Sequence, residues 1–206
     1  MKEYPATEQG YKEWEQNYED GDVIAYQALD PFDIIAQGIQ LGAARFPANE
    51  RYYHIEPIYD AEVGMTVKAN GTEVARANVD DERNRIFEKK SRMVIFRAMP
   101  MKTPEQLTLF KKELIRLLYV KYDKLNLIGH ALTSIGNFFR WLTHTPEHQN
   151  VVGDADKPVC STVALHADRA AGYKICEEYN AENVNPTILV HDKTYQAIAA
   201  IGGKAK

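Results

Sequence analysis

The chain has 206 residues, of which 45% are hydrophobic and 26% are charged, so it can bury a core as one globular domain. Its formal net charge is −4, with lysines and arginines scattered among acidic residues. This pattern lacks the basic stripe that tracks phosphates and argues against nucleic acid as a partner. The two cysteines, Cys160 and Cys176, are too few for a disulfide framework or a cysteine-built zinc site. We expect two reduced thiols, no metal and no cofactor.

The chain shows neither a secretion signal nor a run of roughly 18 apolar residues that could span a membrane. We therefore expect a soluble, cytoplasmic protein and leave incorporation into a larger particle open. The absence of repeats and linkers predicts a single domain over residues 1–206. Within it we expect a polar N-terminal helical segment, over about residues 1–20, and a short flexible C-terminal tail from Ile201 onward.

The first half of the chain is typical of an antiparallel sheet preceded by one strand and one helix. The apolar run from Val23 predicts a strand, and residues 30–46 predict a helix with Asp30 as cap and Pro31 at its first position. Four further runs rich in β-branched and aromatic residues predict strands, and Asn70-Gly71 predicts a hairpin turn between two of them. These four runs are RYYHIEPIYD, GMTVKA, TEVARANV and RMVIFRAM.

The second half of the chain is predicted to be helical. Thr103 as cap and Gln106 at the third position form a capping-box pattern at the start of an amphipathic helix. Residues 124–144 predict a second helix that covers the sheet, and a third begins at Cys160 and stops at Gly172. Strand runs followed by helix runs predict an α+β fold.

Cys160 has two possible roles from its position alone. It opens a predicted helix, whose unpaired N–H groups and positive dipole end lower the pKa of a cysteine thiol placed there. A free cysteine is also among the most buried residue types and commonly only packs. A catalytic role needs a base, so the histidines decide between the two readings.

His54 is the histidine that most needs a polar partner. It lies in the middle of a strand with aromatic and aliphatic neighbours, where a half-buried imidazole must be hydrogen-bonded. A satisfied core histidine is the alternative role. The other histidines fall in polar loops, within an apolar helix, or on the Cys160 helix pointing away from the thiol: His144, His148 and His191; His130; and His166.

The order of short motifs resembles the circularly permuted papain-like hydrolases, the YiiX-like relatives of the NlpC-type cell-wall peptidases and of lecithin retinol acyltransferase. In that family the histidine comes from the first half and the nucleophilic cysteine, at a helix start, from the second. The resemblance covers nearly the whole chain. It is carried by GDVIAY from Gly21, the strand with His54, MVIFRAM, YVKYDKL, VCSTVALHADRAAG and NPTILV.

The resemblance implies a permuted papain-like fold in which Cys160 is the nucleophile and His54 its base. It also implies that the Tyr122 hydroxyl donates to the oxyanion of a tetrahedral intermediate; an ordinary helix-end tyrosine is the alternative. In the flanking motifs, Asp22 is expected to be a structural turn residue. Pro186 is expected to fix a loop.

The third catalytic position departs from the family pattern. Relatives carry an acidic or other polar residue on a strand after the histidine, where this chain offers Lys68 or Arg76, and neither can accept a proton from an imidazole N–H. Asn78 and Glu56 are the candidate substitutes, because Asn78 shares a strand face with Arg76 and Glu56 shares one with His54 at a spacing of two. A backbone carbonyl is a further alternative. We favour Asn78.

The sequence therefore predicts a cysteine-dependent hydrolase or acyltransferase that cleaves an amide or ester bond through an acyl-enzyme. The resemblance implies a small peptide, a peptidoglycan fragment or an acyl-lipid as substrate, and nothing in the chain selects among them. The alternative is a binding or structural protein that keeps the fold without turnover, which the basic residues at the third position favour.

Overall fold

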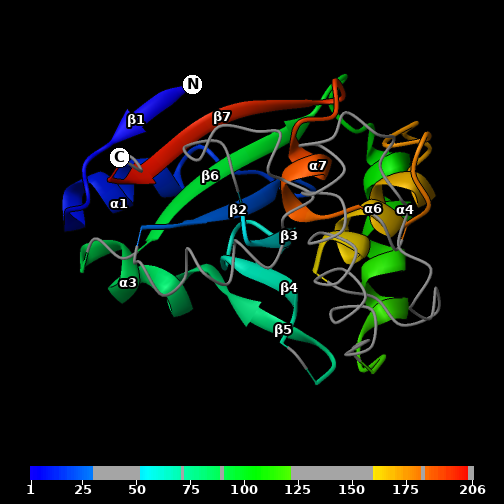
Figure 1. Ribbon diagram of the computed structural model, residues 1–206, viewed down its shortest axis with the longest axis horizontal. Helices are drawn as coiled ribbons and strands as arrows, with labels where there is room; N and C mark the ends of the chain where they lie inside the picture. The colour runs from blue at the N-terminus through cyan, green and yellow to red at the C-terminus, as the bar shows by residue number, and fades with distance from the viewer. Residues whose placement is uncertain (30–51, 71, 89–90, 122–159, 182–183, 204–206) are drawn as a thin grey trace, which may run out of the picture.

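The computed structural model describes residues 1–29, 52–70, 72–88, 91–121, 160–181 and 184–203 (Figure 1). Within them, one seven-stranded sheet has the order β1-β7-β6-β2-β3-β4-β5. Its neighbouring strands are antiparallel except for the parallel pair β1 and β7. The strands are β1 (Lys2–Tyr4), β2 (Val23–Ala28), β3 (His54–Asp60), β4 (Met65–Ala69), β5 (Val74–Asn78), β6 (Ser91–Ala98) and β7 (Tyr195–Gly202). The expected antiparallel strands and the α+β class are confirmed.

The helices begin and end at local signals in the sequence. The predicted capping box is present, since the Thr103 side chain accepts from the Gln106 N–H and the Gln106 side chain accepts from the Thr103 N–H. Gly172, with φ of 89°, follows the Cys160 helix as its predicted stop. The helices are α1 (Glu8–Glu15), the 3₁₀ helix η3 (Val79–Glu82), α3 (Arg83–Phe87), α4 (Pro104–Leu117), α6 (Cys160–Ala170) and α7 (Pro186–Val190).

Side chains of each strand alternate between the two faces of the sheet. Both faces are apolar, and helices cover each of them to form two cores. In β2, Val23 and Ala25 join one core, which α4, α6 and α7 complete. Ile24 and Tyr26 join the other core, which α1 and α3 complete. Figure 1 shows α4, α6 and α7 gathered at one end of the sheet, with α1 and α3 toward the other. In the parts of the chain described, no helix is long and apolar enough to cross a membrane.

Three expectations about local structure need correction. The segment after Asn185 is the helix α7, capped by the Asn185 side chain, because Pro186 at a first helical position starts a helix as readily as it fixes a loop. Ile201 is fully buried in β7, so the chain stays paired beyond the predicted start of the tail. The N-terminal segment contains β1 as well as a helix. The helices predicted over residues 30–46 and 124–144 lie outside the described residues.

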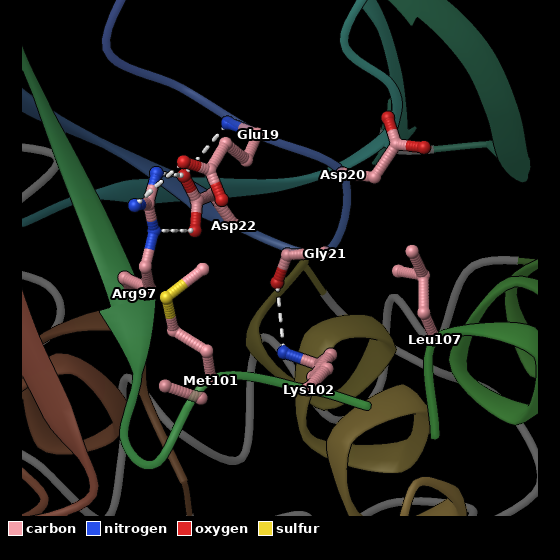
Figure 2. A pocket seen from close by; sticks show the side chains of 9 residues that line it. Glu19, Asp20, Gly21, Asp22, Arg97, Met101, Lys102 and Leu107 are labelled. Atoms are coloured by element: carbon pink, nitrogen blue, oxygen red, sulfur yellow. Dashed lines mark hydrogen bonds and ion pairs between the residues drawn. The ribbon is translucent and has the colours of Figure 1, made fainter. Parts of the chain in front are cut away.

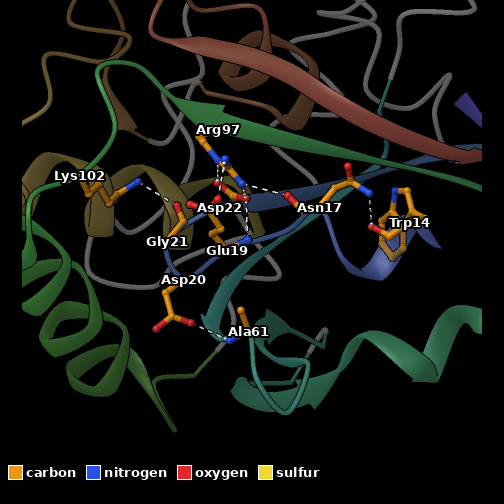
Figure 3. A network of polar contacts seen from close by, with 9 residues as sticks. All are labelled: Trp14, Asn17, Glu19, Asp20, Gly21, Asp22, Ala61, Arg97 and Lys102. Atoms are coloured by element: carbon orange, nitrogen blue, oxygen red, sulfur yellow. Dashed lines mark hydrogen bonds and ion pairs between the residues drawn. The ribbon is translucent and has the colours of Figure 1, made fainter. Parts of the chain in front are cut away.

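The turn before β2 is held by a polar network (Figure 3). The Asp22 carboxylate accepts the Glu19 N–H at 2.9 Å, and two nitrogens of the Arg97 guanidinium donate to it at 2.8 and 2.7 Å. The same guanidinium donates to the Asn17 carbonyl at 2.9 Å. The expectation that Asp22 is a structural turn residue is confirmed, and Arg97 ties this turn to the end of β6.

Candidate active site

His54 is the first residue of β3 and lies opposite Tyr26 of β2 in the strand register. The backbone leading into it is fixed from two sides. The Thr187 hydroxyl on α7 accepts from the Tyr52 N–H at 2.9 Å and donates to the Tyr52 carbonyl at 3.2 Å, and the Tyr53 N–H donates to the Tyr26 carbonyl. These bonds hold the backbone just before His54 against α7 and β2, and so position the imidazole. The role of Thr187 has no signal in the sequence.

Cys160 is the first residue of α6 and is buried. The helix is fixed next to it, because the Ser161 hydroxyl donates to the Val184 carbonyl. Near its other end, the buried Asp168 carboxylate lies 2.8 Å from Lys102 Nζ and accepts from the Tyr195 hydroxyl. The thiol is therefore carried at the positive end of a helix that is anchored at both ends.

The structure brings the side chains of Cys160, His54 and Glu56 together in one site. His54 Nε2 lies 3.1 Å from Glu56 Oε1, and the Cys160 side chain is near enough to the ring to raise the pKa of His54. Because Nε2 faces the carboxylate, Nδ1 is the nitrogen left for the thiol. Sequence-distant thiol and imidazole groups, with a third group orienting the ring, form the arrangement that activates a cysteine nucleophile.

The electrostatics of the site favour a charged imidazole. Burial would lower the pKa of the His54 ring from 6.5, but the interactions with Cys160 and Glu56 outweigh burial and raise it to about 10. Burial would likewise raise the pKa of the Glu56 carboxyl, but the hydrogen bonds from His54 and Thr66 lower it. Hydrogen bonding to the charged forms thus overcomes desolvation at both residues.

Lys68 is one of the two basic residues, with Arg76, that stand where the resemblance implies an acidic or other polar residue, and it lies close to two carboxylates. Its Nζ lies 4.0 Å from Glu56 Oε1 and 3.6 Å from Asp81 Oδ2. The acceptor that His54 requires is therefore present despite the base at this strand position. It comes from the histidine's own strand.

Asn78 is not the partner of His54, contrary to the preference stated from the sequence. Its side chain accepts the Asp80 N–H at 2.9 Å and donates to the Val63 carbonyl at 2.9 Å, which makes it the N-cap of η3. Asparagine is a favoured helix-cap residue, so its position before η3 explains this use of its side chain. Tyr122, the predicted oxyanion donor, lies outside the described residues.

A separate small pocket of about 150 Å³ lies at the far end of the β2–β3 pair from His54. Figure 2 shows the Arg97 guanidinium directed at Glu19 and Asp22, with which it pairs, and Lys102 Nζ directed at the Gly21 carbonyl, to which it donates at 2.8 Å. The pocket shares no residue with the group of Cys160, His54 and Glu56. Among the described residues, no group of three or more His, Cys, Asp or Glu side chains could hold a metal ion.

Comparison with protein-family models and with curated proteins assigns no residue roles in this chain. No protein-family model matches the chain, and no curated protein sequence matches it significantly. The functional argument therefore rests on the geometry at Cys160, His54 and Glu56.

Proposed function

We propose that the protein is a cysteine-dependent hydrolase or acyltransferase that cleaves an amide or ester bond through an acyl-enzyme on Cys160. The observation that supports this most is the His54 ring, which is hydrogen-bonded to Glu56 and interacts with the Cys160 side chain. A packing cysteine needs no imidazole, and a merely satisfied histidine needs no thiol. The fold we propose is the permuted papain-like one, with the histidine strand before the cysteine helix in sequence.

In the proposed reaction, the Cys160 sulfur attacks the substrate carbonyl carbon and forms the carbon–sulfur bond. The proton that His54 holds passes to the leaving amine or alcohol as the carbonyl bond to that group breaks. Water or an acceptor hydroxyl then attacks the thioester, gives its proton to His54, and releases the sulfur. Glu56 keeps Nε2 of the ring occupied throughout, so that Nδ1 stays directed at the sulfur.

The oxyanion of the tetrahedral intermediate needs N–H or O–H donors. The backbone N–H of Cys160, at the start of α6, is one such donor, since the first N–H groups of a helix have no partner within it. The resemblance assigns the second donor to Tyr122. The substrate is a peptide, a peptidoglycan fragment or an acyl-lipid.

Acyl-enzyme formation tests this proposal without knowledge of the natural substrate. The protein is incubated with p-nitrophenyl acetate, and the intact mass and peptide map are recorded. We expect one acetyl group on Cys160, formed in a burst, and none in Cys160→Ala. Cys176 serves as the control within the same molecule, because burial raises the pKa of its thiol to about 12.

A binding or structural protein without turnover is the second candidate, and Lys68 is the observation that favours it. A cation near an imidazole disfavours the imidazolium, and Lys68 shares Glu56 Oε1 with His54. Absence of acetylation at Cys160, with the protein folded, would favour this candidate over the hydrolase.

A further inference from the structure

Thr66 is a buried hydroxyl directed at the candidate active site from the neighbouring strand β4. Its Oγ1 donates to Glu56 Oε2 at 2.6 Å, and the residue is fully buried. The other carboxylate oxygen, Oε1, faces His54 Nε2 at 3.1 Å. The two oxygens of Glu56 are therefore divided between two partners, one on each of two adjacent strands.

This division fixes the rotation of the carboxylate group. A glutamate side chain has three rotatable bonds, and its terminal torsion is broad when nothing restrains it. A short hydrogen bond from a buried hydroxyl to one oxygen restrains that torsion and leaves the second oxygen aimed at the imidazole. The bond also stabilises the ionised carboxylate in a buried place where a lost donor would be costly.

We infer that Thr66 is a positioning residue of the candidate active site, acting through Glu56 to hold the His54 ring toward the Cys160 thiol. This inference rests on the proposed function, because it gives Glu56 the role of orienting a catalytic histidine. In this scheme Thr66 acts on Glu56 and forms no bond of its own to the reacting groups. Its effect on Cys160 is expected to pass through the carboxylate alone.

Other titratable groups also interact with the Glu56 carboxylate. Burial and the Glu56 charge together raise the pKa of both the Tyr26 hydroxyl and the Glu82 carboxyl. Lys68 approaches Oε1, the oxygen that His54 uses, and not the oxygen that Thr66 holds. The titratable and charged groups that interact electrostatically with the carboxylate include His54 on β3, Lys68 on β4, Tyr26 on β2 and Glu82 on η3.

The test measures the rate at which iodoacetamide alkylates Cys160, by peptide mass, as a function of pH. Thr66→Val keeps the shape of the side chain and removes the donor, whereas Thr66→Ser keeps the donor and serves as the rescue variant. At about pH 6 we expect Thr66→Val to react about tenfold more slowly than the wild type, as losing a hydrogen bond to a charged group implies. Thr66→Ser should react at nearly the wild-type rate.

A double-mutant cycle separates positioning from a general loss of structure. If Thr66 acts through Glu56, Thr66→Val should slow alkylation in the wild type and have little further effect in Glu56→Gln, since effects of residues acting in series are non-additive. Equal effects in both backgrounds would overturn the inference. So would a folded Thr66→Val protein whose pH profile matches the wild type.

Failure of the proposed function looks different. In that case wild-type Cys160 itself would react only at alkaline pH, in parallel with Cys176, before any substitution at Thr66 is considered. If Thr66→Val does not fold, Thr66→Ala is used in the same assay. Alanine removes the hydroxyl donor without putting the extra methyl group of valine in its place. A wild-type profile in folded Thr66→Ala rejects the inference.

Discussion

At the level of single residues, Glu56 decides how the His54 ring is oriented. Replacing it by glutamine keeps the size of the side chain but removes the charge that stabilises the imidazolium. We expect Glu56→Gln to lower the rate of Cys160 alkylation near neutral pH on the order of tenfold or more. Peptide mapping after timed exposure to iodoacetamide measures this rate.

Asn78→Ala is the matched control, because Asn78 was the other candidate partner and the structure assigns it a cap instead. Losing the cap should lower the free energy of unfolding by about 1 kcal/mol and leave alkylation of Cys160 unchanged. Slower alkylation in folded Asn78→Ala than in Glu56→Gln would reverse the assignment of the two residues.

The same contacts predict how stability depends on pH. The folded-state pKa of His54 is raised, to about 10 from 6.5, so its contribution to the free energy of unfolding is complete below about pH 6.5 and is lost as pH rises toward 10. The pKa of Glu56 is lowered from 4.5, so its contribution is complete above about pH 4.5 and is lost as pH falls.

Urea unfolding of the wild type and of His54→Gln at a series of pH values measures the first effect. We expect the stability advantage of the wild type to be largest near pH 6 and to shrink steadily above it. An advantage that grows with pH would mean that folding favours the neutral imidazole, contrary to the ion-pair reading.

At the level of elements, α6 depends on the buried pair between Lys102 and Asp168. Both side chains are almost completely buried, and removing one partner of a buried ion pair leaves an uncompensated charge. Lys102→Met should lower the free energy of unfolding by about 3–5 kcal/mol, measured by urea denaturation.

The pair of Arg116 and Glu113 on α4 gives the comparison, since 63% of the Arg116 side chain is exposed. Arg116→Met should cost no more than about 0.5 kcal/mol. Similar losses in the two variants would show that Lys102 does not anchor α6 through its charge.

The elements that the sequence predicts correctly carry their own local signals. The capping box at Thr103 and the glycine after α6 mark helix ends wherever they occur. β1 has no such signal, because a strand of three residues is stable only through its pairing with β7. The sequence likewise does not show whether Glu56 or Asn78 is the hydrogen-bond partner of His54. The two-residue spacing identifies Glu56 as a candidate, but only the packing of η3 shows that Asn78 is already used.

At the level of the whole molecule, β7 lies between β1 and β6 in the sheet. Gly202 allows the end of β7 to approach β6 closely. Its φ is 108°, and a Cβ atom there would lie 2.8 Å from the Ser91 carbonyl oxygen. We expect Gly202→Ala to lower the free energy of unfolding by about 1–3 kcal/mol, because the backbone conformation and the close approach both exclude a side chain.

Gly203→Ala is the neighbouring control, since a Cβ there meets only the Leu29 side chain at 3.4 Å among its nearest contacts. Thermal unfolding of the two variants should separate them clearly. Equal melting temperatures would contradict the close packing of β7 against β6.

The central claim is that His54 activates Cys160, and the pH profile of Cys160 alkylation in the wild type and in His54→Gln tests it most directly. The account predicts that wild-type Cys160 reacts readily at about pH 6 and that His54→Gln reacts only as pH approaches the ordinary thiol range of about 8.5. Cys176 should stay slow in both proteins, because burial raises the pKa of its thiol to about 12. A wild-type profile that coincides with that of His54→Gln would contradict the account.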